Sequence, residues 1–223
     1  MSLLVLDIAT SGLPNVKDFV TTDDITPPSN YVKPEAIKSF VDKEVAKRID
    51  KAGLEPDTCR ITAIGVLWAG SHDTPSVALC RTEEEEAAAL EVLALTMRTM
   101  QPTLVGFNSS KFDWPILMRR ALYLRVPLPP INLDRYRSPH VDLYERLTYR
   151  GTVTGHSLQW YVKRLGWTDL VKPLTGAEEA QVPTTGKWDE LTASVTCDLL
   201  ATARLADWLE LRPVDAVVEE VGL

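Results

Sequence analysis

Three aspartates stand in contexts that would direct a carboxylate into the protein, namely Asp7, Asp113 and Asp198. Asp7 follows the wholly apolar run 3–6, which predicts a short buried strand. Asp113 follows a second apolar run, 104–107, at the start of a predicted helix, and Asp198 has apolar neighbours in a predicted terminal helix. Because a buried carboxylate is costly unless it is paired or binds a cation, these residues are candidate metal ligands.

Two of these aspartates also have a simple structural explanation. A carboxylate in the first turn of a helix is stabilised by the helix dipole, which would account for Asp113. Asp198 could face solvent from one side of its helix. The three residues therefore indicate a site only if the fold brings them together.

The length and composition predict a single domain that spans residues 1–223. At 45% hydrophobic residues, the chain can bury one full core. The three cysteines are too few and too widely spaced for a disulfide framework or a cysteine zinc site, so we expect free thiols in a reducing cytoplasm. The apolar start is too short for a signal peptide, and no run approaches the ~20 apolar residues that span a bilayer.

The charge of the chain is unevenly distributed. The formal net charge of −7 does not suggest a protein that coats nucleic acid. The segment 111–172 nevertheless holds eleven Lys and Arg against five Asp and Glu, a net +6, and leaves −13 for the rest. A basic middle in an acidic chain favours a phosphate-binding face. Scattered, solvated surface charge explains the same counts equally well, and both interpretations stay open.

Hydrophobic periodicity and turn residues predict alternating strands and helices. After the first strand, further strands are expected at 61–69, 76–80, 103–107 and 140–144. Helices are expected at 34–52, 83–100, 112–123, 157–165 and 188–211. Strands that come first, followed by alternation and a final helix, predict an α/β fold with a mixed sheet flanked by helices.

The remaining stretches are predicted to be irregular. A loop and the helix at 34–52 form an insertion at about 14–56, between the first two strands. A turn is expected at 70–71, a proline-rich segment at 124–139 and a loop at 166–186. The four glutamates at 83–86 are most simply explained by the helix dipole, with Thr82 as the N-cap.

The segment around Asp7 resembles the first motif of the DEDD superfamily of 3′–5′ exonucleases, which is a strand followed by Asp-x-Glu-Thr-x-Gly-Leu. Residues 4–13 of this chain read Leu-Val-Leu-Asp-Ile-Ala-Thr-Ser-Gly-Leu. The segment 106–113, an Asn followed by Phe-Asp, resembles the second motif. The segment 197–202, an Asp followed four residues later by Thr, resembles the third. The motifs occur in the family's order, which implies a ribonuclease H-like fold.

Two further segments, 27–37 and 60–65, resemble stand-alone exonucleases related to the exonuclease domain of family B DNA polymerases. Such proteins are common in phages and bacteria, so the resemblance implies the cytoplasm of a bacterial or phage-infected cell. It also implies hydrolysis of phosphodiester bonds at the 3′ end of a single strand. The sequence does not choose between DNA and RNA, because that choice depends on contacts to the 2′-hydroxyl.

The resemblance assigns roles to the aspartates. Two Mg²⁺ or Mn²⁺ ions about 4 Å apart can activate the attacking water and stabilise the leaving oxygen, and hard cations prefer carboxylate oxygens. Asp7 would bridge both ions, Asp198 would join it on one ion, and Asp113 would support the other. The residues expected near the terminal nucleotide are Thr10, Leu13, Phe107, Asn108 and Phe112.

Two groups of residues extend this expected site. The aromatic side chains of Phe107, Phe112 and Trp114 are candidates to stack on unpaired bases, and packing in the core is the alternative. Asp142 also resembles an acidic position seen in family members. We expect it to have a supporting or structural role.

The chain departs from the family at two positions. Residue 9 is Ala where the family has a Glu that ligates metal and contacts the terminal sugar hydroxyl, so metal affinity and turnover should fall. Ser194 stands where the family has a Tyr, and serine is a poor general base, although it could hold the water. His140 and His156 are the other candidates for a base, and a structural role is the alternative for each.

Two explanations of Ala9 lead to two functions. An inactivating substitution would leave the rest of the first motif intact, as is found here, whereas natural degeneracy would also account for Ser194. The first hypothesis is a two-metal 3′–5′ exonuclease impaired by Ala9. The second is a non-catalytic nucleic-acid-binding or interaction module on the same fold, because a fold does not fix a function.

Overall fold

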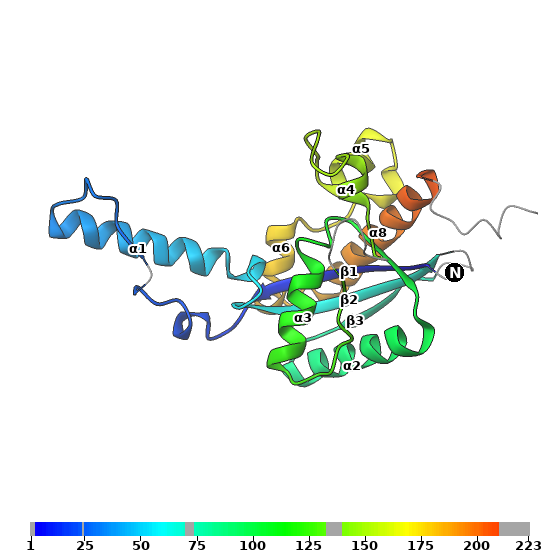
Figure 1. The fold of residues 1–223 in the computed structure, drawn as a ribbon, viewed down its shortest axis with the longest axis horizontal. Coiled ribbons are helices and arrows are strands. Elements are labelled where there is room, and N and C mark those ends of the chain that lie inside the picture. The colour runs from blue at the N-terminus through cyan, green and yellow to red at the C-terminus, as the bar shows by residue number, and fades with distance from the viewer. Residues whose placement is uncertain (1–2, 24, 70–73, 133–139, 210–223) are drawn as a thin grey trace, which may run out of the picture.

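The computed structural model describes residues 3–23, 25–69, 74–132 and 140–209. At its centre is a five-stranded sheet with the order β3-β2-β1-β4-β5 (Figure 1). β1 pairs antiparallel with β2 and parallel with β4, so the sheet is mixed as predicted. The strands are β1 Leu3–Gly12, β2 Cys59–Ala69, β3 Ser76–Leu79, β4 Thr103–Gly106 and β5 Val141–Asp142.

Helices cover both faces of the sheet, which confirms the α/β class. α2 and α3 lie on one face, and α8 lies on the other with α5 (Figure 1). The helices are α1 Pro34–Asp50, α2 Glu83–Met100, α3 Asp113–Tyr123, α4 Leu143–Leu147, α5 Leu158–Arg164, α6 Gly176–Ala180, α7 Val182–Thr185 and α8 Trp188–Trp208. Short 3-10 helices are η1 Val16–Asp18, η2 Ala52–Leu54 and η3 Thr168–Leu170.

β1 divides the core into two apolar clusters. Successive side chains of a strand point to opposite faces. The odd-numbered apolar residues of β1 accordingly join the cluster that contains α8, and the even-numbered ones join the cluster that contains α2 and α3. Asp7 therefore shares the α8 face of the sheet with Val5 and Ala9.

β1 is longer than the sequence analysis predicted. The expectation that the strand ends at residue 6 is wrong, because residues 7–12 continue the antiparallel ladder with β2, with a register shift between Ala9 and Thr10. The parallel pairing with β4 does stop early, at Val5. Asp7 thus lies inside β1, two residues beyond Val5, where the pairing with β4 ends.

The predicted loop at 166–186 is also wrong, because it contains η3, α6 and α7. Thr175 and Glu178 form a reciprocal capping box that starts α6, and a proline stands in the first turn of α7. The strand expected at 140–144 is only β5, and Asp142 then caps α4 with hydrogen bonds from the N–H groups of Tyr144 and Glu145. Helices of four or five residues are too short to show a hydrophobic period.

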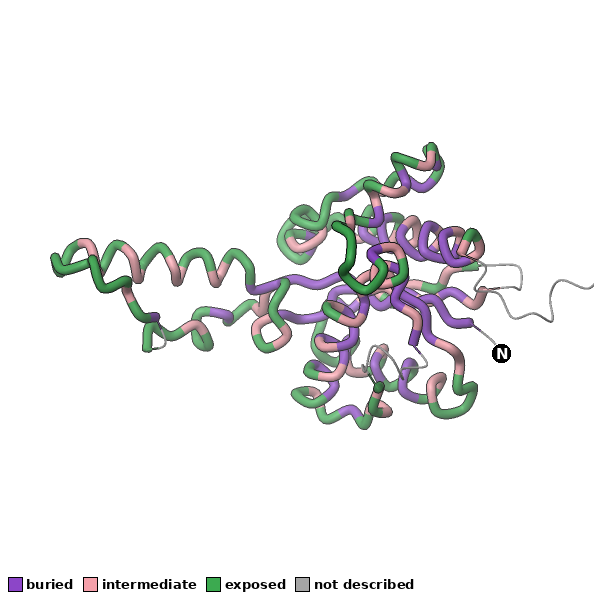
Figure 2. Tube along the Cα trace, turned by 45° about the horizontal axis from the view of Figure 1, so that its top comes forward, coloured by how far each residue is buried: buried purple, intermediate pink, exposed green. Residues whose placement is uncertain are grey.

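α1 forms an arm that projects from the body of the molecule, as Figure 1 shows. None of its residues is buried, and Figure 2 shows exposed and half-buried residues along its whole length, in contrast to the buried sheet. The apolar period that predicted this helix therefore does not mark a face packed in the core.

Some predictions fall outside the described residues. These are the turn at 70–71, the part of the proline-rich segment at 133–139, and the end of the terminal helix beyond residue 209. None of the described helices combines the length and apolar character needed to cross a membrane.

Candidate active site

The three motif aspartates come from separate elements and meet at the edge of β1 that β4 leaves. Asp7 belongs to β1, Asp113 is the first residue of α3, and Asp198 lies in the middle of α8. Asp113 and Asp198 are buried, with 3% and 7% of their surface exposed. The charges of both act on the carboxyl group of Asp7. The fold thus brings the three residues together.

The end of the β4 pairing explains the position of Asp113. Beyond Val5, the sheet no longer supplies an acceptor on this edge of β1. The Ile8 N–H group instead donates to Asp113 Oδ1 at 3.1 Å. The first turn of α3 is thereby fixed to β1, next to Asp7.

Gly65 explains how α8 can approach Asp7. It is paired directly opposite Asp7 in β2. A Cβ atom at Gly65 would lie 2.5 Å from Val195 Cγ1 and 2.9 Å from Leu199 Cδ1. Since Val195 and Leu199 flank Asp198 on α8, the missing side chain lets the helix bring Asp198 down onto the strand.

Asp142 organises the turn that leads to Asp113. Its two carboxylate oxygens accept hydrogen bonds from the Asn108 and Ser110 N–H groups, both at 2.9 Å. Asn108 has a positive φ of 58°, a conformation that asparagine tolerates better than most residues. This is the kind of structural role that we expected for Asp142.

Burial dominates the electrostatics of the aspartates. It raises the pKa of Asp7 well above its ordinary value, and the neighbouring carboxylates of Asp198 and Asp113 raise it further. Burial likewise raises the pKa of Asp113 to about 7, although the Ile8 N–H group opposes this shift. Negative charge at this site is therefore costly, and a cation would relieve that cost.

Lys172 provides a cation at this site. Its Nζ lies 2.8 Å from Asp198 Oδ2 and 2.9 Å from Glu179 Oε1. Burial by itself lowers the pKa of Lys172, but these two carboxylates outweigh it and raise the pKa above its ordinary value. The lysine is therefore charged at neutral pH.

Gln159 and Ser194 hold this lysine and its partner in place. Gln159 Nε2 donates to Asp198 Oδ1 at 2.8 Å, and Gln159 Oε1 accepts the Lys172 N–H group at 3.3 Å. Ser194 is fully buried, and its hydroxyl oxygen accepts the Leu174 N–H group at 3.1 Å. The placement of Ser194 favours a structural role over the water-holding role considered from the sequence.

The sequence analysis missed Lys172, Glu179 and Gln159. Two of them lie in the segment that was predicted to be a loop. The Thr175–Glu178 capping box is a recognisable helix start, and it could have shown that Glu179 lies on a helix. No pattern in the sequence would have aimed Lys172 at Asp198.

Ala9 leaves a gap in the carboxylate set. It is 4% exposed and belongs to the apolar cluster that also contains Leu174 and Val182. A Glu at this position would share the face of Asp7, about 7 Å further along the strand. The structure therefore supplies no carboxylate from this position of β1.

The residues expected near the terminal nucleotide lie in different environments. The Thr10 hydroxyl is buried and donates to the Gly53 carbonyl oxygen at 2.5 Å. The Leu13 N–H group donates to the Thr58 carbonyl oxygen at 2.9 Å, and the Leu13 side chain is half-buried. Phe107 is half-buried against the α8 cluster, with its ring 5.8 Å from that of Tyr144.

The two aromatic residues next to Asp113 belong to the core. Trp114 is 1% exposed, so the prediction that it could stack on a base is wrong. Phe112 is half-buried and packs against the apolar cluster that contains Trp114. Both side chains can point to the core because Phe112 precedes α3 and does not follow the helical spacing of side chains. Phe107 is the candidate of the three that packs on the α8 side, where Asp7 and Asp198 lie.

Both histidines have structural surroundings. His140 is 8% exposed, lies 2.8 Å from Ser109 Oγ through Nε2, and burial lowers its pKa to about 4. His156 stacks on Trp160 at 3.9 Å between the ring centroids. Neither histidine forms a described contact with the three aspartates.

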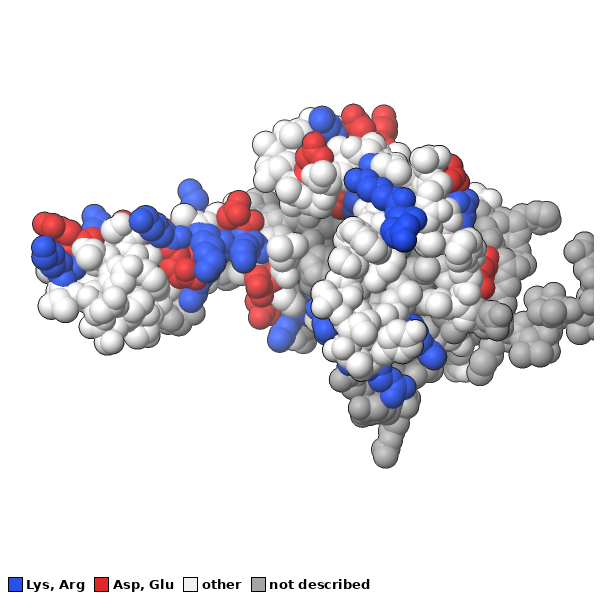
Figure 3. Space-filling view, turned by 90° about the horizontal axis from the view of Figure 1, so that it is seen from above, with Lys and Arg blue, Asp and Glu red and all other residues white. Residues whose placement is uncertain are grey.

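The basic middle of the sequence is partly internal. Arg120 is buried and makes a two-pronged ion pair with Glu86, which is itself fully buried. The dipole explanation therefore fails for Glu86, one of the four glutamates in the first turn of α2. On the face seen in Figure 3, Lys and Arg side chains gather along the arm and in separate places on the body. The side chains along the arm belong to α1 and lie outside the segment 111–172, and on this face those of the body favour scattered charge.

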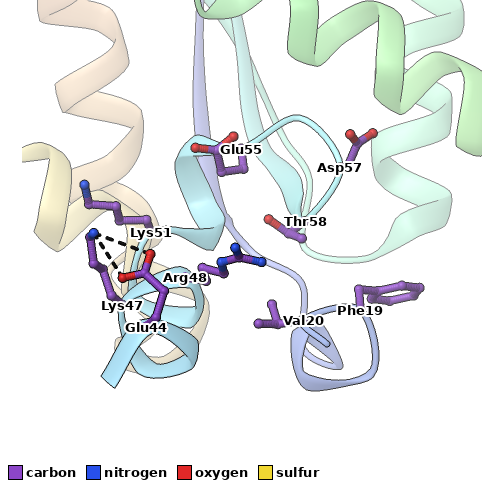
Figure 4. A pocket seen from close by; sticks show the side chains of 9 residues that line it. All are labelled: Phe19, Val20, Glu44, Lys47, Arg48, Lys51, Glu55, Asp57 and Thr58. Carbon is purple, nitrogen blue, oxygen red and sulfur yellow. Dashed lines mark hydrogen bonds and ion pairs between the residues drawn. The ribbon is translucent and has the colours of Figure 1, made fainter. Parts of the chain in front are cut away.

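A groove of about 380 Å³ lies at the root of the arm (Figure 4). It is lined by the two residues that follow η1, by residues of α1 and by the segment that leads into β2, and none of the three motif aspartates belongs to it. Lys47 and Glu44 form an ion pair on its wall at 3.3 Å. The groove and the candidate site therefore share no lining residue.

The donor set at the aspartates is sparse for a site that holds two divalent cations. Asp7 and Asp113 offer carboxylate oxygens of the kind that Mg²⁺ and Mn²⁺ prefer. Asp198 already pairs with Lys172, and Ala9 offers no ligand. Within the described residues, no three His, Cys, Asp or Glu side chains are arranged closely enough to hold a metal ion by themselves.

Comparisons with known proteins agree with this fold. The family model of the RNase_H superfamily matches residues 49–210. The structure of the family B DNA polymerase from the hyperthermophilic archaeon Pyrobaculum calidifontis is similar, with a TM-score of 0.60 and 18% identity over 94% of this chain. The chain spans 24% of the length of that polymerase.

Two further comparisons carry less weight. A structure of exonuclease I gives a TM-score of 0.42 at 11% identity, over 96% of this chain and 42% of that chain, which is too weak to support an argument. No curated protein sequence matches the chain. The resemblance drawn from the three motifs is confirmed at the level of the superfamily and the ribonuclease H-like fold. The chain is a member of the RNase_H superfamily.

Proposed function

We propose that the chain acts on the 3′ end of single-stranded DNA or RNA as a metal-dependent phosphodiester hydrolase of the 3′–5′ exonuclease type. The observation that supports this most is that Asp7, Asp113 and Asp198 approach one another from three distant motifs. Burial and neighbouring carboxylates raise the pKa values of Asp7 and Asp113, and perturbed pKa values of this kind are characteristic of functional sites. The superfamily and the fold are consistent with nuclease chemistry.

In this proposal, Asp7 and Asp113 hold one divalent cation. Such an ion would polarise the scissile phosphate and make a bound water more acidic. The chain's own residues provide the rest of the site. Ile8 and Asp142 fix the position of Asp113 through the main chain, and Gln159 holds Asp198.

Phe107 and Asn108 are proposed to contact the terminal nucleotide. Both lie on the turn that Asp142 organises, directly before Asp113. The half-buried ring of Phe107 could stack on a base, which does not require sequence specificity. Thr10, Leu13 and Phe112 are less suited, because their polar groups are bonded to the main chain or their side chains pack in the core.

The second candidate function is a non-catalytic module that binds nucleic-acid ends. The observation that favours it is the engagement of Asp198, whose two oxygens are bonded to Gln159 and Lys172. Together with Ala9, this leaves two aspartates without an ion-pair partner among the described residues. A site with so few free carboxylates could hold a phosphate and a cation without turning over.

Degradation of a 5′-labelled single-stranded oligonucleotide, as DNA and as RNA with Mn²⁺ or Mg²⁺, tests the proposal. The chain should give a slow ladder of 3′-shortened products. Ala9→Glu should accelerate it more than about tenfold, equivalent to ~1.4 kcal/mol of transition-state stabilisation. Ala9→Gln is the matched control, because it has a similar size but no charge.

The negative controls are Asp7→Asn and an oligonucleotide with a blocked 3′ end, and both should abolish the ladder. Products that shorten from the 5′ end, or a ladder that survives Asp7→Asn, would reject the proposal. No cleavage by the chain or by a folded Ala9→Glu variant, together with binding of the oligonucleotide, would favour the second candidate.

A further inference from the structure

The strongest feature not used by the proposed chemistry is the cluster of Asp198, Lys172 and Glu179. Lys172 Nζ bridges one oxygen of each carboxylate, at 2.8 and 2.9 Å. The side chains are 10–16% exposed, so water screens these contacts little. An ammonium between two carboxylates is arranged as a bound cation would be.

Two main-chain hydrogen bonds fix the segment that carries Lys172. The Lys172 N–H group donates to Gln159 Oε1, and the Leu174 N–H group donates to Ser194 Oγ two residues later. Gln159 also binds Asp198, so one amide side chain joins the lysine's main chain to its carboxylate partner. The ammonium is therefore positioned by the fold and is not a flexible surface group.

Glu179 brings a carboxylate to the α8 face of β1. It lies on α6, which the capping box of Thr175 and Glu178 starts, and its charge acts on Asp7. This face of β1 is also where Ala9 lies and lacks a carboxylate. The site thus regains a fourth acid from a different element, but this acid comes paired with a lysine.

We propose that the Lys172 ammonium takes the place of a second divalent cation, so that the chain binds one such ion and Glu179 serves as the counter-ion of the lysine. This inference rests on the proposed function, since it concerns the same site. It accounts for the disagreement between the donor set and a two-ion site. Removing the ammonium should leave Asp198 and Glu179 free to bind a divalent cation.

Counting bound Mn²⁺ by electron paramagnetic resonance tests this inference without measuring cleavage. The full chain should bind one ion per molecule, and Lys172→Met should bind two. Lys172→Arg, which keeps the charge, should still bind one. The matched control is Lys47→Met, which removes the same side chain from an exposed ion pair with Glu44 on α1 and should also bind one.

The double variant Lys172→Met with Glu179→Gln should lose the second ion again, because one of its two carboxylates is gone. If Lys172→Met is too unstable for its bound ions to be counted, its thermal unfolding provides a second measurement. Ligands that bind only the folded state raise the melting temperature. Mn²⁺ should therefore raise the melting temperature of Lys172→Met more than that of the chain.

Two ions bound to the unmodified chain would overturn the inference. The inference would also be overturned if Lys172→Met bound the same number of Mn²⁺ ions as the chain and showed the same rise in melting temperature with Mn²⁺. Failure of the proposed function would look different, since the counts would follow the prediction while no oligonucleotide was shortened. If the chain shortened the oligonucleotide but Lys172→Met bound no more Mn²⁺ than the chain, the inference would be rejected and the proposed function would stand.

Discussion

At the scale of single residues, burial decides the charge of the site. Asp113 has almost no exposed surface, yet it lies beside Asp7, Asp142 and Asp198, which are also acidic. Its main-chain partner at Ile8 offsets only part of the cost of burying the charge. Asp113 therefore binds a proton more tightly in the folded protein than in the unfolded chain.

This leads to a prediction for the pH dependence of stability in the absence of divalent cations. The pKa of Asp113 is raised to about 7 in the folded protein, above the ordinary aspartate value near 4. The folded state therefore binds the proton more tightly, and the free energy of unfolding falls as the pH rises from about 4 to about 7. Asp113→Asn removes this proton and keeps an acceptor for the Ile8 N–H group.

Relative to the chain, Asp113→Asn should gain about 2–4 kcal/mol of unfolding free energy between pH 4 and pH 8. Urea denaturation at several pH values measures this difference. Asp18→Asn, at an exposed position in η1, is the control and should show no comparable gain. Parallel stability curves for the chain and Asp113→Asn would contradict the burial argument.

At the scale of elements, the contact between β2 and α8 sets the height of Asp198 above β1. Gly65→Ala places a methyl group 2.5 Å from Val195 Cγ1, so the side chain of Val195 or the helix that carries it must shift. We expect a loss of about 1–3 kcal/mol in the free energy of unfolding, as for other overpacked cores. Denaturation of the chain and of Gly65→Ala in urea tests this prediction.

Gly176→Ala is the matched control for this substitution. Gly176 begins α6, its φ is not positive, and a Cβ atom there would meet nothing within 4 Å. It should change the free energy of unfolding by less than about 0.5 kcal/mol, as is usual for open surface positions. Equal stability of Gly65→Ala and Gly176→Ala would show that α8 does not depend on the glycine.

The elements also show where sequence reasoning succeeded. α2 was predicted at its observed bounds, because Thr82 caps it and its apolar residues keep a helical period over many turns. The second motif was placed correctly, because Asp113 follows β4 by a short turn. The segment around Lys172 failed for the opposite reason. Its helices are too short for periodicity, and the lysine's partners come from distant positions.

At the scale of the whole molecule, the body and the arm depend on each other little. The arm meets the body where Gly12 and Gly53 approach closely, with 3.2 Å between a Cβ atom built on Gly53 and the Gly12 nitrogen. Beyond that junction, α1 buries no residue. The core of the molecule is the sheet with its two helical layers, and the aspartate site belongs to this body.

Replacing residues 28–48 with a short Gly-Ser linker should therefore leave the body folded. This replacement keeps the buried residues Val16, Ile25 and Ala52. The melting temperature should change by less than about 4 °C, which corresponds to roughly 1 kcal/mol for a chain of this size. A larger fall, or loss of a single cooperative transition, would show that the arm supports the core.

Residue-level reasoning could predict the site's acids but not its lysine. The motifs indicated Asp7, Asp113 and Asp198 because each stands beside an apolar run with recognisable spacing. The charge balance of the site depends on Lys172 and Glu179, and their contacts are set only by tertiary packing. The length of β1 was missed for a similar reason, since the partner strand β2 decides where the polar residues 10–12 belong.

The most direct test of the central claim is a crystal structure of the chain with a short single-stranded DNA and Mn²⁺. We predict that the 3′-terminal phosphodiester lies against Asp7 and Asp113, with one anomalous Mn²⁺ peak between them and Phe107 next to the last base. A DNA strand seated elsewhere, such as in the groove at the root of the arm, with no Mn²⁺ peak at the aspartates, would contradict the account.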